Sequence, residues 1–170
     1  MLYNHTIKLL ILIFLLITFA SPLKAAAGEV VGTRHNLELV VRVAATGLGG
    51  LLKGITSQEK QIKMVAKFIK SVRFFPDSSG YFFVYNNKGT CVAHATQPEI
   101  VGKNLTDLQD SSGQFVIKNL IATAKMGGGF VEYGWKKPLA IEPQDKLGYV
   151  APIPGTDLFI GSGIYFSSLQ

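Results

Sequence analysis

The segment that most constrains the fold is residues 81–85, which read Tyr-Phe-Phe-Val-Tyr. Successive side chains of a strand point to opposite faces, so Tyr81, Phe83 and Tyr85 would share one face. The two even-numbered residues, Phe and Val, would share the other. Both faces of this strand are therefore apolar, and one of them is expected to be a wall of aromatic rings.

A polar turn and a second apolar run follow this strand directly. Residues 86–89, Asn-Asn-Lys-Gly, tolerate left-handed backbone conformations, so the two runs are predicted to form an antiparallel hairpin. In the returning strand, His94 would lie on the same face as Val92 and Thr90, with Cys91 on the opposite face. An aromatic sheet surface that carries one imidazole is a starting point for a small-ligand pocket.

Residues 1–27 are predicted to be a secretory signal peptide. Their apolar run, Leu9–Ala20, has 12 residues, well short of the about 20 that a membrane-spanning helix needs. Three alanines, residues 25–27, offer a cleavage site. An uncleaved membrane anchor is the alternative. Export predicts a periplasmic location and leaves residues 28–170 as one domain.

Charge and cysteine content limit the partners and the covalent cross-links of this chain. The chain carries 17 basic and 11 acidic side chains, and loss of Lys8 and Lys24 with the signal peptide would leave 15 against 11, a net charge of +4. This modest, scattered charge on an exported chain argues against a nucleic-acid partner. Cys91 is the only cysteine, so no internal disulfide can form, and we expect Cys91 to be a small apolar core residue.

The remaining segments alternate between helical and strand patterns. Apolar residues at three- and four-residue spacings predict helices over residues 30–47, 56–72 and 112–126. The second helix would begin with a capping box of Thr56 and Glu59, and glycines would end the first. Further strands are predicted over residues 130–135, 147–152 and 158–166. The pattern indicates an α+β domain with a mainly antiparallel sheet.

Taken in order, these segments resemble the single Cache domain (sCache_2-like) of bacterial extracytoplasmic sensors and chemoreceptors. The matching residues are Gly80–Val84, Ala93–His94, Pro98–Leu105, Asp107–Asp110, Gly128–Tyr133, Trp135 with Pro138, Lys146 with Tyr149–Val150, and Ile160–Tyr165. The resemblance covers roughly residues 58–167. It implies a PAS-like fold, in which a long N-terminal helix packs on a curved, mainly antiparallel sheet of about five strands.

The resemblance also places a ligand pocket on the concave face of the sheet. The candidate ligand-binding residues are Arg73, Tyr81, Phe83, His94, Tyr133, Trp135, Lys146 and Tyr149. A buried carboxylate needs fixed donors, which Arg73, His94 and Lys146 could supply, while the aromatic residues supply walls and hydroxyl or indole donors. Structural roles are the alternatives: core packing for the tyrosines and the tryptophan, a satisfied core imidazole for His94, a surface position for Lys146, and an ion pair with Asp77 for Arg73.

These observations predict an exported, stand-alone sensory domain that reversibly binds a small organic anion such as acetate, propionate, lactate or pyruvate. The sequence ends at Gln170 without a kinase or chemotaxis module, so a membrane receptor or sensor kinase would be the signalling partner. The resemblance implies a homodimer contact through the N-terminal helix. No enzyme, metal or cofactor motif is present. Two alternatives remain open: a structural module of an envelope complex, and an enzyme that acts on a small acid.

Overall fold

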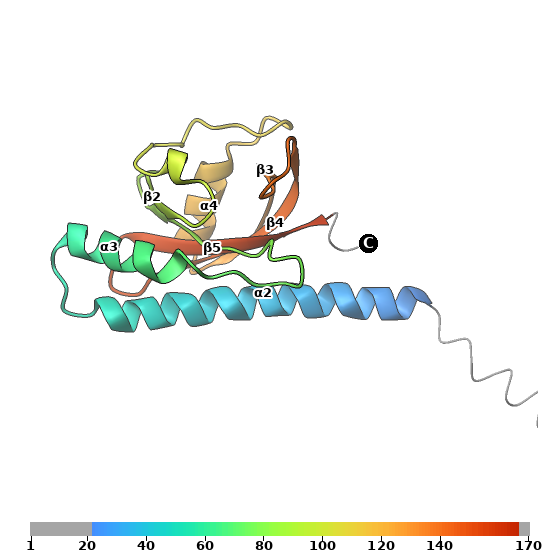
Figure 1. Ribbon diagram of the computed structural model, residues 1–170, viewed down its shortest axis with the longest axis horizontal. Helices are drawn as coiled ribbons and strands as arrows, with labels where there is room; N and C mark the ends of the chain where they lie inside the picture. The colour runs from blue at the N-terminus through green and yellow to red at the C-terminus, as the bar shows by residue number, and fades with distance from the viewer. Residues whose placement is uncertain (1–21, 167–170) are drawn as a thin grey trace, which may run out of the picture. The chain divides into compact units, whose positions relative to one another are not determined.

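The computed structural model describes residues 22–166, with side chains from residue 32 onward (Figure 1). Most of the predicted signal peptide, residues 1–21, lies outside the described residues. The chain divides at His35, and the residues from Asn36 onward form one compact unit. No helix in the described part of the chain is long and apolar enough to cross a membrane.

Helices and strands follow each other in the order that the sequence predicts. They are α2 (Pro22–Leu52), α3 (Gln58–Ile69), β1 (Phe83–Asn86), β2 (Cys91–His94), the short 3-10 helix η1 (Pro98–Ile100), α4 (Val116–Lys125), β3 (Gly129–Lys136), β4 (Pro143–Pro152) and β5 (Leu158–Tyr165). The strands form one antiparallel sheet in the order β2-β1-β5-β4-β3. The last strand of the chain is therefore central, and the predicted α+β fold with five strands is confirmed.

The sheet separates two apolar clusters, one on each face. The first cluster joins α2 and α3 to residues such as Phe82, Val84 and Leu147. The second joins α4 to the aromatic residues of β1, including Phe83 and Tyr85. Figure 1 shows α3 and α4 on opposite sides of the sheet. The alternation predicted for residues 81–85 is confirmed, because its odd and even positions enter different clusters.

Two predicted helix boundaries are wrong. Ser57, not Thr56, caps α3, and its side chain accepts a hydrogen bond from the backbone of Lys60. The glycines near residue 50 do not end α2, which continues to Leu52. A side chain at Gly49 would begin only 2.8 Å from the ring of Pro154. This glycine therefore allows α2 to lie close to the segment after β4, and it does not form a turn.

The third helix also begins later than predicted, at Val116 instead of residue 112. The preceding residues form a loop that the Asp110 carboxylate organises. It accepts backbone hydrogen bonds from Ser112 (2.9 Å), Gln114 (3.0 Å) and Gly134 (3.0 Å). Asp110 therefore fastens this loop to β3, and the polar residues before α4 are used in the loop rather than in a helical turn.

A β-bulge changes the faces of the β1–β2 hairpin. Val84 pairs with Ala93 but Tyr85 pairs with Cys91, so Val92 is the extra residue. The expectation that Cys91 and His94 lie on opposite faces is therefore wrong: Cys91 packs in the second cluster, against whose rings the His94 imidazole also lies. Cys91 is buried, as expected of a core residue, and burial raises the pKa of its thiol to about 11.

Candidate functional site

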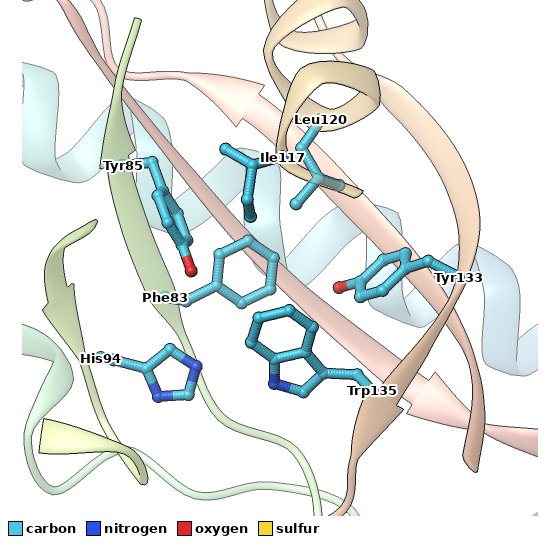
Figure 2. Close-up of a pocket in the computed structure, with 7 residues that line it drawn as sticks. All are labelled: Phe83, Tyr85, His94, Ile117, Leu120, Tyr133 and Trp135. Atoms are coloured by element: carbon cyan, nitrogen blue, oxygen red, sulfur yellow. The ribbon is translucent and has the colours of Figure 1, made fainter. Parts of the chain in front are cut away.

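A small cavity lies on the α4 face of the sheet, between β1, β2, β3 and α4 (Figure 2). Its lining residues are Phe83, Tyr85, His94, Ile117, Leu120, Tyr133 and Trp135. The space open to the centre of a water-sized sphere is about 10 Å³, which corresponds to roughly one water molecule. Four predicted site residues, Phe83, His94, Tyr133 and Trp135, are thus brought together from three strands.

His94 presents a hydrogen-bond donor to this cavity. Its Nδ1 accepts backbone hydrogen bonds from Gln97 (3.0 Å) and Thr96 (3.3 Å). Burial, with the nearby positive charges of Lys146 and Arg73, lowers the pKa of His94 to about 3. The ring is therefore neutral at pH 7, and because Nδ1 is an acceptor, the proton lies on Nε2. Figure 2 shows this second nitrogen facing the space beside Phe83 and Trp135.

The fully buried side chain of Lys146 lies beside the cavity wall. Its ammonium donates a 2.9 Å hydrogen bond to the Tyr81 hydroxyl. The nitrogen also lies 4.2 Å from the ring centroid of Tyr81, 4.9 Å from that of Tyr165 and 5.5 Å from that of Phe83. Burial lowers the pKa of Lys146, while the Tyr81 hydroxyl opposes this shift.

No Asp or Glu in the described part of the chain forms an ion pair with Lys146. Burial of an ammonium costs several kcal/mol of desolvation free energy. Each contact with an aromatic face returns about 0.5–2 kcal/mol, so these contacts offset the cost only in part. Phe83, whose ring centroid lies 5.5 Å from the ammonium nitrogen, also lines the cavity. The cavity therefore borders a buried amino group that no carboxylate of the described side chains pairs with.

A chain of hydroxyl groups fixes the position of this ammonium. Tyr81 and Tyr165 are hydrogen-bonded through their hydroxyls at 3.1 Å, and the Tyr165 hydroxyl donates to the backbone carbonyl of Lys136 at 3.0 Å. Lys146 and Tyr165 are direct partners in the β4–β5 register. Tyr81 thus belongs to the predicted site through Lys146 and His94, whose ring centroid lies 5.1 Å from its own.

Glycines on the sheet make room for the large side chains of this face. A side chain at Gly163 would begin 2.4 Å from Lys146, one at Gly161 would begin 2.5 Å from Phe83, and one at Gly148 would begin 2.7 Å from Tyr133. The Gly-Ser-Gly sequence of β5 therefore lets a lysine and a phenylalanine lie flat on the sheet. Spacing alone does not reveal this role, because it depends on the strand register.

Two predicted site residues lie elsewhere. The Arg73 guanidinium donates to the backbone carbonyls of Val72 and Ala95, both at 2.7 Å, and Arg73 does not line the cavity. Asp77 forms an ion pair with Lys137 at 3.0 Å. Arg73 fixes the backbone next to His94, and it acts on the cavity only through its charge.

Tyr149 packs in the cluster on the other face of the sheet. Its hydroxyl donates to Glu38 of α2 at 3.1 Å, and its ring lies 4.8 Å from that of Phe130. Lys146 and Tyr149 are three residues apart in one strand, so strand alternation places them on opposite faces. The expectation that both face the same pocket is corrected on this ground.

Three lining residues were missing from the predicted site. Tyr85 is on the same strand face as Phe83, so the alternation that selected Phe83 could have selected Tyr85 as well. Ile117 and Leu120 belong to the predicted apolar stripe of α4, but the sequence does not say which sheet face that stripe covers. Among residues with described side chains, no group of three or more His, Cys, Asp or Glu residues could hold a metal ion.

The fold and this site define a sensory domain class, and comparison with known proteins identifies it. The Cache domain model named dCache_2 matches residues 44–170, and the chain belongs to this family. It is similar to the sensor histidine kinase MctS of Rhizobium johnstonii, with 37% identity over 117 residues that cover 69% of this chain and 25% of the kinase. It is also similar to the methyl-accepting chemotaxis protein McpP of Pseudomonas putida, with 27% identity over 139 residues, 81% of this chain and 25% of that protein.

Solved structures agree with this assignment. A methyl-accepting chemotaxis protein from Vibrio parahaemolyticus superposes with a TM-score of 0.75 and 29% identity, covering 87% of this chain and 98% of that one. A Cache chemosensory domain described as a structural basis for carboxylic acid recognition superposes with a TM-score of 0.69 and 26% identity, covering 81% and 97% of the two chains. The chain spans about a quarter of the length of the curated relatives. The predicted Cache fold is confirmed.

Proposed function

We propose that this chain is a periplasmic, non-catalytic sensory domain that reversibly binds a small organic monocarboxylate, of the size of acetate, propionate, lactate or pyruvate. The observation that carries the proposal is the buried ammonium of Lys146. A buried cation without a counter-charge is costly, and an anion that enters beside it forms a desolvated pair. Binding therefore gains from a charge that the fold already holds in place.

His94 and the aromatic walls add orientation and selection by size. The Nε2–H of His94 is fixed by the two hydrogen bonds at Nδ1 and can donate to a carboxylate oxygen. Rings of Phe83, Tyr133 and Trp135 surround the same space. With about 1.5 kcal/mol per heavy atom as the ceiling, a ligand of four to six heavy atoms binds with at most about 6–9 kcal/mol, so micromolar affinity is expected.

The cavity must enlarge when such a ligand enters, because it holds roughly one water molecule. Its walls come from two groups of elements: β1 with β2 on one side, and β3 with α4 on the other. A ligand that binds the enlarged form more tightly shifts the protein toward it. We propose that this displacement is the signal passed to a receptor or kinase partner.

The relatives support a signalling partner of this kind. They are a sensor kinase and a chemotaxis protein, and one structural neighbour is described as the periplasmic sensor domain of a chemotaxis protein. A homodimer through α2 forms part of the proposal. Leu39, Val43 and Leu51 expose 52%, 63% and 56% of their surface at spacings of four and eight residues, which gives α2 an apolar stripe for a second copy.

The small cavity volume favours one second candidate, a structural module of an envelope complex whose pocket is filled by its own side chains. A thermal-shift screen of C2 to C4 carboxylates separates the two. A ligand at one hundred times its Kd stabilises the fold by about 2.7 kcal/mol, so the sensor should melt several degrees higher. At the same ligand concentration this shift should fall to about half or less in Lys146→Ala and His94→Ala and persist in Lys67→Ala, which removes an exposed lysine of α3. A flat response across the panel supports the structural module.

A further inference from the structure

Tyr85 carries a buried hydroxyl that has no nitrogen or oxygen partner among the described residues. The residue is 1% exposed, and its hydroxyl is the one buried side-chain nitrogen or oxygen without a hydrogen bond among the described residues. Burial, and then the charge and weak hydrogen bonding of the neighbouring Cys91 thiol, raise the pKa of Tyr85 above its usual range. The hydroxyl is therefore protonated at neutral pH, and this thiol is a poor substitute for an oxygen or nitrogen partner.

Packing holds this hydroxyl at the cavity. The Tyr85 ring stacks on Phe159 at 6.0 Å and meets Phe83 edge-on at 5.9 Å. Tyr85 lines the cavity, and Figure 2 shows its oxygen directed toward the space between Phe83 and His94. A phenylalanine would fill the same volume without burying an unpaired polar atom, so folding alone gives no reason for the hydroxyl.

The position of Tyr85 suits a polar group next to a carboxylate held by His94. Phe83 pairs directly with His94, and Tyr85 lies two residues along the same strand face, about 7 Å away. The Tyr85 hydroxyl and the His94 ring face one cavity of about 10 Å³ (Figure 2), so the hydroxyl faces the atoms next to a carboxylate held by His94. An unsubstituted alkanoate presents only C–H groups to Tyr85, whereas a carbonyl or hydroxyl on C2 presents a hydrogen-bonding atom.

We propose that Tyr85 makes this site selective for short 2-oxo or 2-hydroxy monocarboxylates over unsubstituted ones. The inference rests on the proposed function, since it requires a carboxylate in the cavity. A site that hydrogen-bonds a polar group of its ligand rejects analogues that lack the group, because its own buried atom then stays unpaired. Tyr85 is on this view the specificity-determining residue, while Lys146 and His94 recognise the carboxylate common to all ligands.

Lactate and isobutyrate provide a matched pair for calorimetric titration, because they differ only by a hydroxyl in place of a methyl group. Wild-type protein should bind lactate or pyruvate at least about tenfold more tightly than isobutyrate and propionate. Tyr85→Phe should lower the affinity for the substituted acids by at least about tenfold and leave that for isobutyrate and propionate within about threefold. Tyr149→Phe, which removes a hydroxyl on the other sheet face, should keep the wild-type ratio.

Equal affinity of wild-type protein for lactate, pyruvate and isobutyrate overturns the inference without any variant. An equal loss for all ligands in Tyr85→Phe overturns it as well. If propionate or isobutyrate binds and Tyr85→Phe changes nothing, only the selectivity fails and the carboxylate sensor stands. If none of the four acids binds at millimolar concentration, the proposed function fails together with it.

Discussion

The two faces of the sheet bury polar groups in different ways. On the α2 face, the Tyr149 hydroxyl donates to Glu38, and Glu38 also pairs with Arg42 at 2.8 Å. On the α4 face, the Lys146 ammonium has no carboxylate partner among the described residues and the Tyr85 hydroxyl has no hydrogen bond. The first face is complete as folded. The second holds a buried amino group without a carboxylate and a buried hydroxyl without a nitrogen or oxygen partner, and both lie at or beside the cavity.

Neighbouring residues of β4 show how closely the two roles lie in sequence. Leu147 is 2% exposed in the α2-side cluster, while Lys146 is fully buried on the cavity side. One step along the strand thus separates a residue that stabilises the fold from one that we assign to binding. Variants on the two faces should therefore change different measurements, and the predictions below run from the largest expected effect to the smallest.

Leu147→Ala should destabilise the protein strongly. Truncation of a buried leucine to alanine removes apolar contacts and leaves a cavity, at a cost of about 2–5 kcal/mol in the free energy of unfolding. Urea denaturation measures this loss. Carboxylate affinity of the folded variant should stay within a few-fold of wild type, and a large loss of affinity at full stability would break the division between the faces.

Lys146→Met should have the opposite profile. Methionine fills similar space without a charge, so the free energy of unfolding should stay equal or rise, since a buried unpaired cation is removed. Loss of one partner of a buried charge pair costs about 2–5 kcal/mol in binding, so carboxylate affinity should fall at least about thirtyfold by calorimetry. Full affinity in Lys146→Met would place the ligand away from this ammonium.

Stability should decrease between pH 6.5 and 4.5 because of His94. Its pKa is lowered to about 3 in the folded protein, so in this range the unfolded chain takes up a proton that the native ring refuses. The free energy of unfolding should fall by up to about 1.4 kcal/mol per pH unit as the pH is lowered. Urea denaturation of wild type and His94→Asn at both pH values measures the effect. If the free energy of unfolding of His94→Asn changes with pH as steeply as that of wild type, other titrating groups cause the effect.

The two ring nitrogens of His94 can be tested separately. Asparagine keeps an acceptor near the Nδ1 position but lacks the Nε2 donor, and glutamine keeps a donor near Nε2 but lacks the Nδ1 acceptor. His94→Asn should fold normally and bind carboxylates about tenfold more weakly. His94→Gln should retain more affinity and lose stability instead. The reverse order of affinities would mean that Nε2 is not the donor.

Much of this architecture follows from local sequence patterns. The aromatic alternation of residues 81–85 defined the two faces of β1, and the apolar stripe of α4 was recognisable from its spacing. The motifs that resemble Cache domains placed His94, Tyr133 and Trp135 together, and the strand alternation added Phe83. Each of these signals depends on residues near one another in sequence.

Features that depend on the register in which strands pair were not predictable in this way. The bulge at Val92 reverses the face of Cys91, and the β4–β5 register places Lys146 opposite Tyr165. Alternation within β4 already indicated that Tyr149 and Lys146 lie on opposite faces of the sheet. The family resemblance nevertheless led to the prediction that both line the pocket. Arg73 was selected by its charge, and the contacts that occupy it are backbone carbonyls, which a sequence pattern does not reveal.

Trp135 offers the most direct test of the central claim that the α4 face binds a small carboxylate. It is the only tryptophan in the chain, its ring lines the cavity, and its indole N–H donates to Gln97 at 2.9 Å. Titration of wild-type protein with pyruvate or propionate should change its fluorescence with saturation in the micromolar range, and Lys146→Met should show no such change. Constant fluorescence in wild-type protein up to millimolar ligand would contradict the account.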